Sequence, residues 1–120
     1  MPGGLDLARG DLALVLTAQG AGTVVSGPVA NAGQAAFVLV MANTSVATGT
    51  GPTLAVTVEE SDNGTSGWAA VPGGAATAIP GVGNAVCAAA PSKNFVRLSA
   101  VVAGTTPAVT ARVAVVVFAE

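Results

Sequence analysis

The chain has 120 residues, a length typical of a single domain with one hydrophobic core. Hydrophobic residues make up 52% of it and charged residues only 8%, against about 25% in ordinary globular domains, so much of the folded surface must be apolar or uncharged. Four basic residues in a chain of net charge -2 offer no patch for nucleic acid, and no apolar run reaches the ~20 residues of a membrane-spanning helix.

The first eleven residues differ from the rest, because they are rich in glycine and carry most of the scarce charge of the N-terminal half. We predict an extended N-terminal arm over 1–11 and one domain over 12–120. Composition alone leaves two interpretations open, a frayed terminus or a segment that becomes ordered against a neighbouring protein. The start has no basic and apolar signal segment, which predicts synthesis and assembly inside a cell. The candidate interface residues of the arm are Leu5, Leu7, Arg9 and Asp11.

After the arm, extended segments rich in β-branched residues alternate with clusters of Gly, Pro, Asn and Ser, and almost no segment has helical periodicity. This pattern predicts an all-β fold. The predicted strands are 12–18, 23–29, 35–42, 53–60, 68–71, 85–89, 94–103 and 108–118, with a short piece near 77–79.

Alternation within these segments predicts which side chains are buried. In 54–59 the Leu and Val residues share one face, and in 95–102 the set Val96, Leu98, Ala100 and Val102 forms the better core face. The last strand becomes apolar on both faces toward its end, and 37–41 is continuously apolar. Such strands need cover on both sides, from a second sheet or from another subunit.

Turn residues separate the strands at intervals typical of a sandwich. Asp62-Asn63-Gly64 suits a hairpin tip, and Gly- and Pro-rich runs at 49–52, 72–74, 80–83 and 104–107 mark loops. Seven or eight strands so spaced predict a single antiparallel β-sandwich, immunoglobulin-like or jelly-roll, preceded by the arm.

The residue inventory predicts a protein that is not an enzyme. His and Tyr are absent, so neither a Ser-His-Asp nor a Cys-His arrangement can form, and no catalytic residue is assigned. The single Cys87 lies among small residues and is interpreted as a small buried hydrophobe rather than a reactive thiol. Glu59 to Asp62 could suggest a calcium site, but a polar hairpin tip explains them better, and no metal or cofactor is predicted.

Trp68 is the only tryptophan and follows the hairpin tip. A lone tryptophan in a sheet is most often a core residue, but its bulk could also anchor an interface or stack on a sugar. We keep Trp68 as a candidate interface residue.

Two stretches carry a family resemblance. One runs from Thr53 through the Ser61-Asp62-Asn63-Gly64 tip and Trp68 to Gly73, and the other from Lys93-Asn94-Phe95-Val96-Arg97 to Gly104-Thr105-Thr106-Pro107. Together they resemble small β-sandwich capsid decoration (cement) proteins of tailed bacteriophages. The resemblance covers roughly the C-terminal two-thirds of the chain, from Thr53 to Val117, and the first fifty residues add nothing to it.

The resemblance implies a structural virion protein that binds the outside of an assembled capsid and stabilises it. Its implied partners are the major capsid protein and further copies of itself, often as trimers, and its implied place is the capsid surface after synthesis in the host cytoplasm. A tail or head-tail joining component remains an alternative, as does a sandwich module that binds carbohydrate or a cell surface through Trp68 and the Asp62 loop.

Overall fold

The computed structural model describes residues 12–31 and 37–118, and every regular element in them is a β-strand paired in the antiparallel sense. The predicted all-β sandwich is therefore confirmed. No described segment forms a helix long and apolar enough to cross a membrane. The strands are β1 (Ala13–Gln19), β2 (Gly22–Val25), β3 (Val29–Ala30), β4 (Phe37–Ser61), β5 (Ala69–Ala75), β6 (Ile79–Pro80), β7 (Gly83–Ala89) and β8 (Phe95–Phe118).

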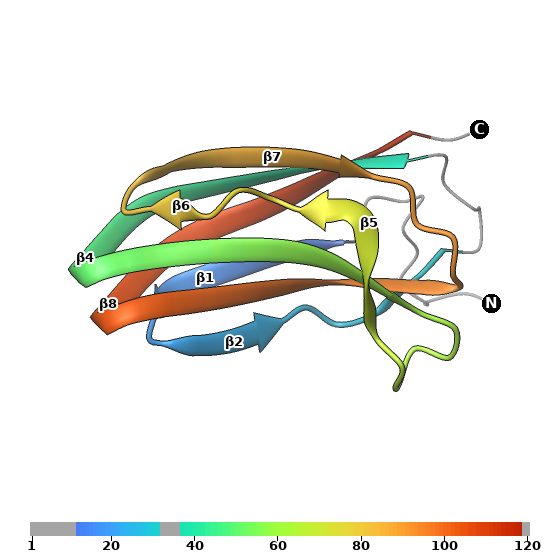
Figure 1. Ribbon diagram of the computed structural model, residues 1–120, viewed down its shortest axis with the longest axis horizontal. Helices are drawn as coiled ribbons and strands as arrows, with labels where there is room; N and C mark the ends of the chain where they lie inside the picture. Colours follow the sequence, from blue (N-terminus) through green and yellow to red (C-terminus); the bar gives the residue numbers. More distant parts are fainter. Residues whose placement is uncertain (1–11, 32–36, 119–120) are drawn as a thin grey trace.

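Two long strands, β4 and β8, organise the fold. They pair with each other from Phe37 opposite Phe118 to Ser61 opposite Phe95, and both bend sharply at the same end of the molecule (Figure 1). One hydrogen-bonded sheet thereby folds over into two layers. The first layer contains β1, β7 and the halves of β4 and β8 over 37–48 and 107–118. The second layer contains β2, β3, β5, β6 and the halves over 53–61 and 95–103.

The sequence predicted separate strands on either side of 49–52 and of 104–107, and the structure joins them. The chain bends at these positions, but the two bends lie against each other, with Thr50 opposite Thr105, and strand pairing resumes directly after them. The described part of the predicted segment 35–42, residues 37–42, and the segment 53–60 are thus parts of one strand, β4, which also includes 43–52. The Pro72-Gly73-Gly74 run lies inside β5, where the register with β4 shifts.

The core lies between the two layers and follows the predicted alternation. Val56 and Val58 of β4 are buried, as are all four residues of the set predicted in 95–102. In the last strand, Val109, Ala111 and Val113 face inward, and Val116 and Phe118 are exposed on the other side. The sequence prediction that this strand ends with two apolar faces is confirmed.

One buried polar group has no hydrogen-bond partner in the described part of the chain. Thr44 is 0% exposed, and its Oγ1 neither donates nor accepts a hydrogen bond. We expect Thr44→Val to raise the free energy of unfolding by about 1 kcal/mol, because valine has the same shape without the unpaired hydroxyl. Urea denaturation would measure the change. Thr48→Val, at an exposed position of the same strand, should change it little, and a loss of stability in T44V would contradict the assignment.

Candidate functional site

The outer face of the first layer carries most of the exposed large hydrophobic residues of the described chain. Ten large hydrophobic side chains are exposed in the described chain, and six of them lie on this face. Strand register aligns them in rows, with Phe37 opposite Phe118, Leu39 opposite Val116 and Met41 opposite Ala114. We call it the apolar face, and its apolar members are Ala13, Val15, Phe37, Leu39, Met41, Val86, Ala88, Ala114, Val116 and Phe118.

One polar row crosses the apolar face. Asn43 lies between Asn84 of β7 and Arg112 of β8, and its Nδ2 donates to Oδ1 of Asn84. Arg112 is exposed and has no ion-pair partner among the residues that the structure describes. Shallow hollows of about 410 Å³ and about 320 Å³ adjoin it, the first toward Val15 and the second toward Val86. Arg112 is thus the single charge that this face presents in the described chain.

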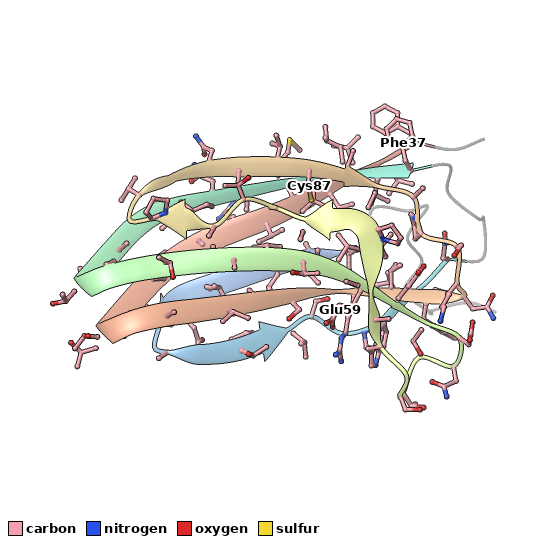
Figure 2. The ribbon with its side chains drawn as sticks, viewed as in Figure 1. Phe37, Glu59 and Cys87 are labelled. Atoms are coloured by element: carbon pink, nitrogen blue, oxygen red, sulfur yellow. The ribbon has the colours of Figure 1, made fainter. Side chains whose placement is uncertain are left out.

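A stacked aromatic pair closes the other end of the apolar face. The rings of Phe37 and Phe118 have centroids 4.4 Å apart and planes inclined by 18°. They remain 39% and 41% exposed, and Figure 2 shows Phe37 projecting outward at the end of its layer. Two of the three phenylalanines of the chain therefore keep about two-fifths of their surface exposed.

Trp68 lies on the second layer, away from the apolar face. The guanidinium carbon of Arg97 is 4.4 Å from the centroid of its ring, and Arg97 Nε donates to Glu59 Oε1 at 2.7 Å. The side chains of Glu59 and Arg97 are each 23% exposed, and the two residues are opposite each other on β4 and β8. Glu59 is labelled on this layer in Figure 2. One face of the indole is thus occupied by Arg97, and sequence reasoning missed this contact.

We expect Arg97→Met to lower the free energy of unfolding by about 1–2 kcal/mol, because it removes the ion pair and the cation–π contact but keeps an apolar stem. Fluorescence of the single tryptophan during urea denaturation would measure the change. Lys93→Met is the control: the ion pair of Lys93 with Asp62 spans 3.8 Å, and its partners are 36% and 79% exposed. The assignment fails if both substitutions have equal effects.

The hairpin tip after β4 is held by its own hydrogen bonds. Asn63 Oδ1 accepts from the amides of Thr65 and Ser66, each at 2.9 Å. The nearby carboxylates have separate partners, with Glu59 on Arg97, Glu60 on the amide of Ser92 and Asp62 close to Lys93. In the described part of the chain no three His, Cys, Asp or Glu residues converge in a way that could hold a metal ion. The geometry fits the predicted polar tip.

Cys87 points toward the core from β7 (Figure 2). It is partly buried against the core cluster, and this burial raises the pKa of its thiol. A raised pKa lowers the thiolate fraction at neutral pH, and the thiolate is the reactive form. This arrangement agrees with the interpretation of Cys87 as a small hydrophobe.

Four of the five predicted interface residues, Leu5, Leu7, Arg9 and Asp11, lie outside the described residues, as does the predicted arm. The apolar face was foreseen only in part, through the two-sided hydrophobicity of β8 and of 37–41. The residues of the apolar face come together only through strand register, which places Phe37 opposite Phe118 and Asn43 opposite Arg112.

No protein-family model matches this chain, and no curated protein matches its sequence. Among solved structures, the PBSX exported protein XepA is similar over 100% of this chain, with a TM-score of 0.67 and 17% sequence identity. The chain spans only 40% of the length of XepA.

Two structures with carbohydrate-binding modules are similar as well. TmCBM61, solved with beta-1,4-galactotriose, matches 90% of this chain and 69% of its own, with a TM-score of 0.50 and 14% identity. The CBM22-1–GH10 modules of the Clostridium thermocellum xylanase 10B, solved with xylohexaose, match 78% of this chain and 19% of theirs, with a TM-score of 0.50 and 10% identity. Likeness at such identities shows a shared β-sandwich fold.

Proposed function

We propose that this chain is a structural virion protein that binds the outer surface of a phage capsid and stabilises it. The observation that carries the proposal is the apolar face, which gathers six of the ten exposed large hydrophobic residues around a single described charge. A continuous apolar surface of this kind marks contact with other proteins. Burial of this face in a contact stabilises that contact by roughly 25 cal/mol per Å² of apolar area, and the same gain recurs at each copy bound to the shell.

The comparisons support the coarser part of this proposal. XepA, which is similar over the whole chain, is phage-related, and two further similar structures contain carbohydrate-binding modules. Both kinds of neighbour fit a sandwich that binds rather than catalyses.

The arm provides the contact with the major capsid protein in this proposal. Its alternating Leu5 and Leu7, followed by Arg9 and Asp11, offer apolar and charged groups to a groove on the shell. We expect removal of the residues before Leu12 to weaken attachment without lowering the melting temperature of the sandwich. An arm-less protein that binds capsids normally would overturn this part of the proposal.

Co-sedimentation with capsids assembled without this protein tests the proposal directly. We expect saturable binding, and electron microscopy of the loaded particles should show evenly spaced copies over the shell. A few copies at one vertex would indicate a tail or head-tail joining component. Absence of binding at micromolar concentration would refute a capsid role.

The second candidate function is binding of carbohydrate, and the polar row of the apolar face favours it. Planar amide and guanidinium groups beside two hollows suit the hydroxyl groups of a sugar. A glycan array tests this function, with Asn43→Ala and Trp68→Ala compared side by side. Glycan binding by the wild type that is lost in either variant would support this function, and capsid association that is unchanged in the variants would count against it.

A further inference from the structure

The two ends of the apolar face differ in a way that would let two copies of it fit together. Four rows cross it, named here by their β8 residues: the Arg112 row, the Ala114 row, the Val116 row and the Phe118 row. The cation lies in the first row and the stacked aromatic pair in the last. Among the residues that the structure describes, the two rows between them hold only apolar side chains, of which Met41 and Leu39 are the largest.

We infer that a second copy of this chain covers the apolar face, through a two-fold axis that runs across the strands between the Ala114 and Val116 rows. Such an axis places the Arg112 row of each copy over the Phe118 row of the other, and Met41 over Leu39 of the second copy. An interface of this kind uses the same patch on both subunits and closes after two copies. The inference rests on the proposed function: it assigns the apolar face to contacts between copies and leaves attachment to the shell to the arm.

Charge favours the second copy as the occupant. Arg112 has no acidic partner in the described chain, and this arrangement gives it the face of an aromatic ring, to which a guanidinium is attracted. The molecule already contains such a contact, between Arg97 and Trp68 at 4.4 Å. The two Arg112 side chains of a pair would be about 20 Å apart, six residues at about 3.3 Å each, which exceeds the ~8 Å Debye length.

The size of the face is adequate for a specific pair. In the described chain the four rows hold four, four, three and two strands, and these thirteen positions at about 4.8 Å by 6.6 Å give a projected area of roughly 410 Å². Protruding side chains have more accessible surface than their projection, so full coverage approaches the lower range of specific interfaces, roughly 600 Å² per partner. A pair of moderate affinity is expected, in place of the trimers that the family resemblance implies.

Sedimentation of the full chain at several concentrations tests the inference. We expect the wild-type protein to form dimers, and Met41→Lys or Leu39→Glu each to weaken the pair about a hundredfold or more, because each buries an unpaired charge. Mixing the two variants should restore a dimer, since the introduced lysine of one copy then faces the introduced glutamate of the other, while the unchanged Leu39 faces the unchanged Met41. Val101→Lys, on the exposed surface of the second layer, is the control and should leave the dimer intact.

Each other outcome counts against the inference. A monomeric or trimeric wild type overturns it, as does a mixture that stays monomeric. If the wild type is a monomer and Met41→Lys abolishes capsid binding, the face binds the shell instead, and the inference fails while the proposed function stands. If the wild type forms the expected dimer but binds no capsid, the proposed function fails by itself.

Discussion

Gly49→Ala is expected to lower the free energy of unfolding by about 3 kcal/mol, which corresponds to about 10 °C or more in melting temperature. Gly49 lies at the bend of β4 with φ +102°, a conformation that residues with a side chain rarely adopt. A Cβ at this position would lie 2.6 Å from the carbonyl oxygen of Thr106 and 2.9 Å from Cα of Pro107. Both contacts are with backbone, so the two bends would have to separate.

Thermal unfolding followed by circular dichroism measures this effect. Gly27→Ala is the matched control, because a Cβ there meets no atom within 4 Å, and its effect should stay within about 0.5 kcal/mol. A Gly49→Ala protein that unfolds at the same temperature as the control would contradict the close packing of the two bends.

The parts of the fold that local alternation determines were predictable. Val56 and Val58 alternate with polar or small residues, so their burial could be deduced before any strand was paired, and the same holds for Val96 and Leu98. The continuity of β4 and β8 through their bends was not predictable. Glycine and proline favour a turn locally, and only the facing bend of the other strand keeps the two segments in one ladder.

The candidate site depended on contacts between residues far apart in the chain. A strand that is apolar on both faces needs cover on each side, from a second sheet or from another protein. The sequences of β8 and of 37–41 showed this two-sided hydrophobicity. The sequence could not indicate that Phe37 stacks on Phe118, or that Arg97 pairs with Glu59, because strand order and register set both contacts. The contact of Trp68 with Arg97 was unpredictable for the same reason, because Arg97 belongs to a distant strand, β8.

Glu60 shows most clearly what alternation predicts and what it misses. It continues the inward series of Val56 and Val58, and it is only 6% exposed. Its Oε1 accepts from the amide of Ser92 at 2.9 Å and from that of Lys93 at 3.3 Å, in the connection between β7 and β8. A carboxylate that the sequence pattern assigns to a polar strand end is therefore a buried acceptor for a distant segment.

We expect Glu60→Ala to lower the free energy of unfolding by about 2 kcal/mol, because it leaves both amides without their acceptor at a partly buried site. Glu60→Gln should cost only about 1 kcal/mol, since its side-chain oxygen can still accept both hydrogen bonds. Urea denaturation with an unchanged m-value would show that each variant keeps the fold and differs in stability alone. Equal losses in the two variants would mean that the negative charge of Glu60, and not its role as an acceptor, holds the connection from β7 to β8.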